Sequence, residues 1–211
     1  MSPKGLELDG MEKLVIKGGK KLNGSVKVKG AKNAIGKMLM ASLLTEEEVV
    51  LKNVPNNQET EIAMEICRQI GSEVERSGDI VRARTPKIEN SRVTELTRRN
   101  RIPILALGPL LARVGEGEVP FVGSTIQPET RTELETAVSK AEGDKIGPRP
   151  VDFHIASLQK LGAEVEVKES TIFAKTTKLR GATIVLPYPS VGATENTILA
   201  SVLGRSNRRI R

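Results

Sequence analysis

The chain has 211 residues, of which 38% are hydrophobic and 28% charged, as expected of a soluble globular protein with one sizeable domain or two small ones. Its net charge of +7 admits nucleic acid, a membrane surface or an anionic small molecule as a partner. With three Phe, one Tyr and no Trp, the chain lacks the aromatic platforms on which single-stranded nucleic acids stack. Basic residues are scattered, apart from clusters at 97–101 and 207–211. We therefore expect no nucleic-acid binding; that alternative rests on charge alone.

The single cysteine, Cys67, excludes an internal disulfide and indicates a reducing compartment, so we expect a cytoplasmic protein. Its neighbours in EIAMEICRQIG (61–71) place it on the apolar face of a helix, where a buried structural role is expected. No apolar run approaches the roughly 18 residues that a membrane-spanning helix needs, and the N-terminus lacks the apolar region of a signal peptide. We expect no membrane partner.

Two patterns follow one another along the chain and then recur. In KLNGSVKVKGAKNAIGKMLMASLL (21–44) an alternating strand pattern is followed by a Gly-Ala turn and an apolar helix. CRQIGSEVERSGDIVRARTPKI (67–88) is typical of a helix end, a C-cap glycine and two strands joined by a tight turn. The second pattern returns in LQKLGAEVEVKESTIFAKTTKL (158–179), and the first in KLRGATIVLPYPSVGATENTILASVL (178–203). The sequence thus predicts a βαβαββ module repeated in tandem.

We predict an α/β protein in which one module covers about 21–88, a second covers about 104–179, and a partial third covers 180–211. Such a module buries one helical face only against its neighbours, so an incomplete third module leaves part of the arrangement unfinished. Residues 124–142 have no counterpart in the first module and are polar. We interpret them as an insertion that forms a solvated helix or stays without regular structure.

Four motifs carry a resemblance to a known family, and they occur in this order: GAKNA (30–34), RNRIPILALGPLLARVGEGEVP (99–120), GDKIGPRPVDFHIASLQKLGAEV (143–165) and SVGAT (190–194). Together they resemble the UDP-N-acetylglucosamine 1-carboxyvinyltransferases, the enolpyruvyl transferases of the first committed step of peptidoglycan synthesis. The paralogous shikimate-pathway enolpyruvyl transferases are less similar. The resemblance covers about 12–203 except for the insertion. It implies an inside-out α/β barrel fold with two domains of three βαβαββ modules each, and an active site in the cleft between them.

Members of this family are about twice as long as this chain, so the resemblance implies that residues 21–211 correspond to one domain. Residues 1–20 belong, in the family, to the other domain. We expect an enzyme by family whose chain is inactive alone, because residues of the second domain cannot be found in the sequence. The alternative is a non-catalytic truncated or engineered fragment that retains at most weak UDP-sugar binding. The sequence predicts no oligomeric state.

The reaction implied by the resemblance transfers the enolpyruvyl group of phosphoenolpyruvate to a hydroxyl of UDP-N-acetylglucosamine. The hydroxyl adds to C2, a proton is delivered to C3, and phosphate is then lost. These two small molecules are the expected partners, and the reaction needs no metal or redox cofactor. It does need cations for a phosphate and a carboxylate, a general acid, and groups that hold a nucleotide sugar.

Lys32 and Asn33 lie where the strand pattern gives way to the helix. A helix N-terminus presents unpaired N–H groups, and a lysine there adds a positive charge for an anion. By resemblance Lys32 contacts phosphoenolpyruvate and Asn33 the sugar, and both belong to the catalytic set. From GAKNA alone, the alternative is that Asn33 caps the helix and Lys32 is a solvated side chain.

Four further site residues are assigned by resemblance. Arg101 faces the substrate cleft, and Arg149 binds phosphoenolpyruvate in the catalytic set, a role that suits a planar guanidinium. Asp152 and His154 line the nucleotide-sugar site. For His154, the only histidine of the chain, a plain structural hydrogen bond is the alternative.

Asp144 occupies the place where most of the family has a cysteine on a mobile loop. A free carboxyl with a pKa of about 3.9 is ionised at neutral pH, so Asp144 acts as the general acid only if burial or a neighbouring anion raises its pKa. We expect resistance to thiol-directed inhibitors such as fosfomycin. The insertion at 124–142 lies directly before this loop and threatens the placement of the catalytic group.

Ser190, Val191 and Gly192 in SVGAT repeat the strand-to-helix pattern of GAKNA. By resemblance they hold the uridine diphosphate through backbone and hydroxyl donors. Tyr188 stands where many members have lysine, which weakens the diphosphate contact expected there. The alternative is a tight turn ahead of a helix.

Overall fold

The computed structural model describes residues 15–93, 95–97, 102–120, 151–168 and 170–203, and the backbone of 209–210. The interpretation of 124–142 as an insertion therefore lies outside the described residues. The same holds for three of the expected site residues, Arg101, Asp144 and Arg149.

Two parts of the chain form the same unit of a strand, a helix and a β-hairpin. The first unit comprises β1 (Val49–Leu51), α2 (Gln58–Ile70), β2 (Glu73–Ser77) and β3 (Ile80–Arg84); the second comprises β4 (Glu116–Pro120), α5 (Asp152–Lys160), β5 (Glu164–Val167) and β6 (Thr171–Lys175). In each unit the last strand is the middle of a three-stranded antiparallel sheet, in the orders β1-β3-β2 and β4-β6-β5. The two units thus share their order of elements and their sheet topology.

A helix precedes each of these two units, and a further helix belongs to a third, partial unit. These helices are α1 (Lys32–Ser42), η1 (Ile102–Ala106) continuing into α3 (Leu107–Arg113), and α6 (Val191–Ser201). α6 connects β7 (Thr183–Ile184) to β8 (Arg209–Ile210), and these two strands pair in parallel. A similar crossover precedes the second unit, because Arg92 forms a parallel bridge with Glu118 of β4. Arg92 lies ahead of residue 104, the position at which the sequence analysis began the second module.

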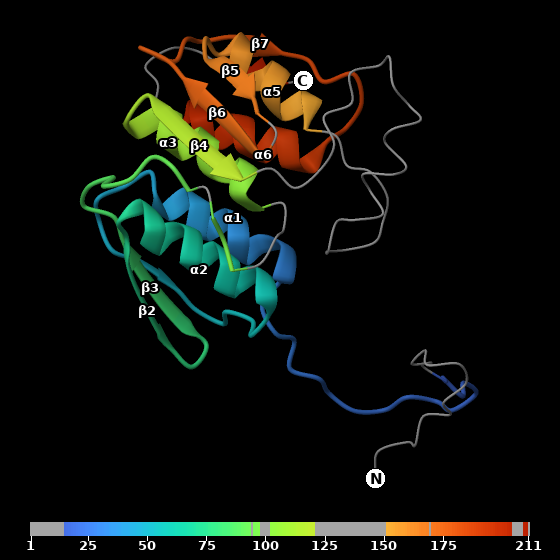
Figure 1. The fold of residues 1–211 in the computed structure, drawn as a ribbon. Helices are drawn as coiled ribbons and strands as arrows, with labels where there is room; N and C mark the ends of the chain where they lie inside the picture. The colour runs from blue at the N-terminus through green and yellow to red at the C-terminus, as the bar shows by residue number, and fades with distance from the viewer. Residues whose placement is uncertain are drawn as a thin grey trace.

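The strand expected within 21–31 does not form in the described structure. These residues have no strand partner and are exposed, with Val26 88% and Val28 81% accessible. Figure 1 shows this segment running away from the body of the molecule. An extended segment without a neighbouring strand leaves its N–H and C=O groups hydrogen-bonded to water. An alternating sequence pattern alone therefore does not form a strand here.

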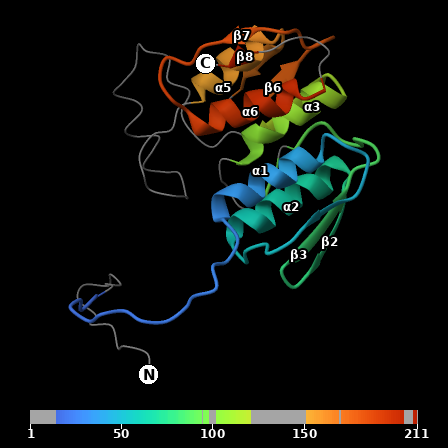
Figure 2. The ribbon, with the colours of Figure 1, turned by 180° about the vertical axis from the view of Figure 1, so that it is seen from behind.

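α1 and α2 lie between the first sheet and the rest of the described body (Figure 1 and, from behind, Figure 2). α1 and α2 pack on each other and on the first sheet, whereas α3 packs on β4 and β6 and also on α6. The largest fully buried side chains are all leucine, isoleucine or methionine, as the scarcity of aromatic residues requires. Cys67 is fully buried among them, and burial raises the pKa of its thiol to about 12. No helix of the described residues is long and apolar enough to cross a membrane.

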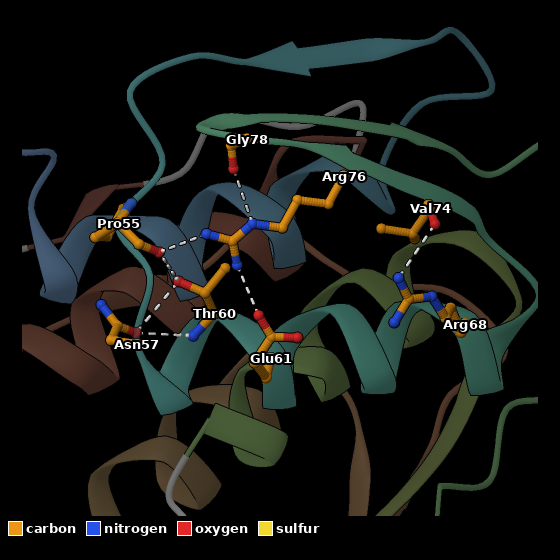
Figure 3. Close-up of polar contacts among 8 residues, drawn as sticks. All are labelled: Pro55, Asn57, Thr60, Glu61, Arg68, Val74, Arg76 and Gly78. Carbon is orange, nitrogen blue, oxygen red and sulfur yellow. Dashed lines mark hydrogen bonds and ion pairs between the residues drawn. The ribbon is translucent and has the colours of Figure 1, made fainter.

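Polar contacts at both ends of α2 fix it under the first sheet (Figure 3). Asn57 caps the helix by accepting a hydrogen bond from the Thr60 backbone N–H at 3.0 Å, which satisfies one of the unpaired donors of the first turn. Arg76 of β2 reaches back to α2, where its Nη1 lies 2.6 Å from Oε1 of Glu61. Gly71 ends the helix with φ of 110°, a conformation that favours glycine. The C-cap predicted at this glycine is confirmed.

Gly108 brings α3 close to α6. A Cβ atom at this position would lie 2.9 Å from the Asn196 carbonyl oxygen and 2.9 Å from the Ala200 backbone nitrogen. Only a residue without a side chain permits this approach of the two helix backbones. The close packing sets the position of α6, on which the expected diphosphate-binding residues lie.

Candidate functional site

The N-terminus of α1 carries Lys32 and Asn33 on an exposed turn. The N-cap residue is Ala31, and no side chain caps the helix there, so the alternative that Asn33 is the helix cap is wrong. Gly30, just before this turn, packs closely on the chain, since a Cβ atom at this position would collide with the Asn53 carbonyl oxygen. The turn is therefore positioned by close backbone packing.

Lys32 is positioned by an ion pair between the first turns of two helices. Its Nζ lies 3.5 Å from Oε1 of Glu59 at the start of α2, and its side chain is 52% exposed. An exposed pair of this kind contributes little to stability. Lys32 is the first residue of α1, and a lysine charge and the helix dipole at a helix N-terminus both favour an anion.

The N-terminus of α6 is built by Ser190. Its Oγ accepts a hydrogen bond from the Ala193 backbone N–H at 3.4 Å, and its carbonyl accepts from the Thr194 backbone N–H and hydroxyl at 3.1 and 2.8 Å. This capping satisfies some of the unpaired backbone N–H groups of the first turn. The Ser190 hydroxyl can still donate its own proton. Val191, the next residue, is 71% exposed. The turn ahead of a helix is thus present, at an exposed position of the chain.

His154 of α5 lies against the first turn of α6. A Cβ atom on Gly192 would lie 3.1 Å from its Nε2, and its Nδ1 is 3.3 Å from Nδ2 of Asn196. Burial lowers the pKa of His154 to about 4, although the nearby Asp152 carboxylate acts in the opposite direction. Asp152 itself is exposed in the first turn of α5. The imidazole is therefore neutral at pH 7 and joins α5 to α6.

α1 and α6 begin at the same edge of the molecule. Lys37 of α1 and Glu195 of α6, each in the second turn of its helix, form an ion pair of 3.4 Å, and both ribbon views show the two helices starting on the same side (Figures 1 and 2). His154 adds the start of α5 to this edge through its contact with Gly192. We define the candidate site as the first turns of α1, α5 and α6.

This site contains all the expected site residues that the structure describes. They are Lys32, Asn33, Asp152, His154, Ser190, Val191 and Gly192. Asn196, in the middle of α6, contacts His154 from behind this site; the sequence analysis did not single it out, because an amide within a helix of small and apolar residues carries no signal of its own. Within the described part of the chain, no group of three or more His, Cys, Asp or Glu residues is arranged to hold a metal ion. The chemistry available here is anion binding by backbone N–H groups, a lysine and a neutral imidazole.

An α/β arrangement in which several helix N-termini, a lysine and a neutral imidazole meet at one edge is suited to the binding of anionic substrates. The sequence profile of the EPSP synthase (3-phosphoshikimate 1-carboxyvinyltransferase) family matches residues 16–210. The chain belongs to this family of carboxyvinyltransferases.

Similar proteins from chlamydiae are named UDP-N-acetylglucosamine 1-carboxyvinyltransferase. That of Chlamydia muridarum is 43% identical over 205 residues, which are 95% of this chain and 42% of the relative. That of Chlamydia abortus is 45% identical over 190 residues, or 88% of this chain and 38% of the relative. The resemblance found in the sequence is confirmed. The chain spans about two fifths of the length of these curated relatives.

Two solved structures share the fold at low sequence identity. The enolpyruvyl transferase NikO from Streptomyces tendae has a TM-score of 0.68 at 16% identity, covering 92% of this chain and 42% of that chain. EPSP synthase from Acinetobacter baumannii has a TM-score of 0.61 at 16% identity, covering 89% and 40%. The predicted α/β enolpyruvyl transferase fold, present only in part, is confirmed.

Proposed function

We propose that this chain provides the substrate-binding half of a UDP-N-acetylglucosamine 1-carboxyvinyltransferase. The observation that carries the proposal is the meeting of three helix N-termini at one edge, together with every expected site residue that the structure describes. Both substrates are anions, and helix N-termini bind phosphate and carboxylate groups. The names of the relatives at 43% and 45% identity support this choice of substrates.

The two substrates occupy different helix ends in this proposal. Lys32 at α1 takes the phosphoenolpyruvate anion, and Asn33 beside it takes the sugar. Ser190, Val191 and Gly192 hold the diphosphate through backbone and hydroxyl donors, while Asp152 and His154 line the nucleotide-sugar site.

The remaining roles fall on residues outside the described structure. We assign Arg101 and Arg149 to the substrate anions and Asp144 to the general acid that protonates C3 as the sugar hydroxyl adds to C2. With aspartate in place of a reactive thiol, the protein resists fosfomycin. Peptidoglycan synthesis in the cytoplasm, and with it a part in cell shape and cell division, follows from this function. Since the chain spans about two fifths of its relatives, we expect it to bind UDP-sugar without turnover when alone.

Calorimetric titration of the 211-residue chain with UDP-N-acetylglucosamine tests the proposal. We expect saturable binding that is weakened about tenfold or more in a Lys32→Ala, Arg149→Ala double variant, because charged contacts to an anion are lost. Lys160→Ala is the matched control, since Lys160 is an exposed lysine in the last turn of α5, at the opposite end of that helix from the site. Failure of a cooperatively folded wild-type chain to bind would overturn the proposal and favour the non-catalytic fragment.

A further inference from the structure

Asn196 is a buried amide in the middle of α6, behind the candidate site. The residue is only 1% exposed. Its side chain contacts His154 on α5, with 3.3 Å between Nδ2 of Asn196 and Nδ1 of His154. Burying an amide is costly unless its polar atoms find partners. The Oδ1 atom has no hydrogen-bond partner among the described residues. This amide therefore needs an explanation that its packing alone does not give.

The surroundings of the amide determine which way it points. A Cβ atom on Gly108 would lie 2.9 Å from Oδ1 of Asn196, so a Cα–H of Gly108 faces that oxygen. A carbonyl oxygen can accept such a weak C–H contact, whereas an NH₂ group placed there would face another hydrogen. The oxygen therefore belongs on the Gly108 side, and the NH₂ group belongs on the His154 side.

An NH₂ group can only donate, so the imidazole nitrogen that it meets must accept. Nδ1 of His154 is then unprotonated, and a neutral ring carries its proton on Nε2. Nε2 lies beside the first turn of α6, 3.1 Å from the position of a Cβ atom on Gly192. We propose that Asn196 is a positioning residue that holds neutral His154 in its Nε2–H tautomer, so that this N–H donates at the N-terminus of α6.

The tautomer matters for the kind of ligand the site accepts. With Nε2–H, the imidazole adds a donor to the backbone N–H groups of the first turn, and the whole set favours an anionic oxygen. With Nδ1–H, Nε2 would offer a lone pair to the same oxygen and repel it. The low pKa of His154, which burial causes, keeps the donor uncharged. That the anion is the diphosphate of a nucleotide sugar rests on the proposed function.

Nitrogen-15 NMR of the imidazole tests the tautomer directly. His154 is the only histidine, so its two ring nitrogens are identified without further assignment. At pH 7 we expect Nδ1 to show the shift of an unprotonated acceptor and Nε2 that of a protonated nitrogen. A wild-type spectrum with Nδ1 protonated, or with the two tautomers equally populated, would overturn the proposal even if no variant folds.

Two variants and a control separate positioning from packing. Asn196→Leu removes the donor and should give a mixture of tautomers, while Asn196→Asp places an acceptor at Nδ1 and should move the proton there. Thr197→Val is the control, because Thr197 is equally buried and its Oγ1 donates to the Ala193 carbonyl at 2.7 Å rather than to His154. An Asn196→Leu protein that keeps the wild-type tautomer would also contradict the proposal.

Affinity for UDP-N-acetylglucosamine gives a second readout. We expect Asn196→Asp to weaken binding about tenfold, because Nε2 of His154 would change from a donor to an acceptor facing the charged ligand. Thr197→Val should leave the affinity unchanged. Equal affinities of Asn196→Asp and wild type would contradict the role of the tautomer in binding. Absence of binding by the wild type would instead refute the proposed function, while the NMR result would still decide the tautomer.

Discussion

Glu118 shows how one buried residue ties three segments together. Its carboxylate accepts hydrogen bonds from Nζ of Lys168 at 2.9 Å and from Oγ1 of Thr171 at 2.7 Å, and Nη1 of Arg92 lies 3.8 Å away. The bonds from Lys168 and Thr171 hold the pKa of Glu118 below its ordinary value of 4.5. A lowered pKa means that the ionised carboxylate stabilises the fold. This contribution is present above pH 4.5 and is lost as the pH falls through the lower folded pKa.

Replacing Glu118 should therefore reduce stability in a pH-dependent way. We expect Glu118→Gln to lower the free energy of unfolding at pH 7 by about 1–3 kcal/mol, as hydrogen bonds to a charged group are lost. The deficit should shrink as the pH is lowered, which urea unfolding at a series of pH values will measure. Glu164→Gln is the control, because the exposed pair of Glu164 with Lys175 should contribute under 1 kcal/mol. Equal deficits in the two variants would contradict this account.

Among the elements, the contact of α3 with α6 depends most on a single position. A side chain on Gly108 would press on the backbone of α6 at both Asn196 and Ala200. Backbone atoms of a packed helix cannot move aside as the end of a side chain can, so overpacking here costs about 1–3 kcal/mol. We expect Gly108→Ala to lower the free energy of unfolding by that amount.

Gly18→Ala is the control for this substitution, since a Cβ atom at Gly18 meets nothing within 4 Å. Chemical denaturation of both variants measures the difference. A Gly108→Ala protein as stable as the wild type would show that the two helices separate easily. The imidazole spectrum of Gly108→Ala should also change, because the Asn196 amide would lose its position.

Local patterns predicted most of the elements. The glycines after α2 and α5, with φ of 110° and 94°, were recognisable because a helix end followed by a tight turn needs the left-handed conformation. The start of α6 was recognisable in SVGAT because a strand pattern gives way there to a helix pattern. The sequence also brought the site residues together through its resemblance to a known family.

Contacts between distant residues were not predictable from local patterns. The amide of Asn196 meets His154 across 42 positions of the chain, and no periodicity relates two residues on different helices. The parallel bridge of Arg92 with Glu118 was missed because a single bridge leaves no alternating pattern. The prediction of a strand within 21–31 was wrong for the opposite reason: the alternating pattern is present, but among the described residues no strand pairs with it.

At the scale of the whole molecule, the described body begins at Gly30. Residues 15–29 are exposed and unpaired, whereas Gly30 packs on Asn53. β1 has only β3 as a strand partner, so one edge of the first sheet is open in the described structure. The corresponding strands of the other units do pair in parallel, at Arg92 with β4 and at β7 with β8.

Removing the exposed segment should consequently leave the body intact. We expect a chain that starts at Ser25 to have the Tm of the full chain, because residues 15–24 bury no apolar surface and make no strand pairs. Hydrogen exchange should agree, with amides of 15–29 exchanging at the rate of a free peptide and those of β3 protected. A clear fall in Tm, or slow exchange at Val26 and Val28, would show that the segment occupies the open edge of β1. The segment would then pair with β1 in the first unit as Arg92 pairs with β4 in the second.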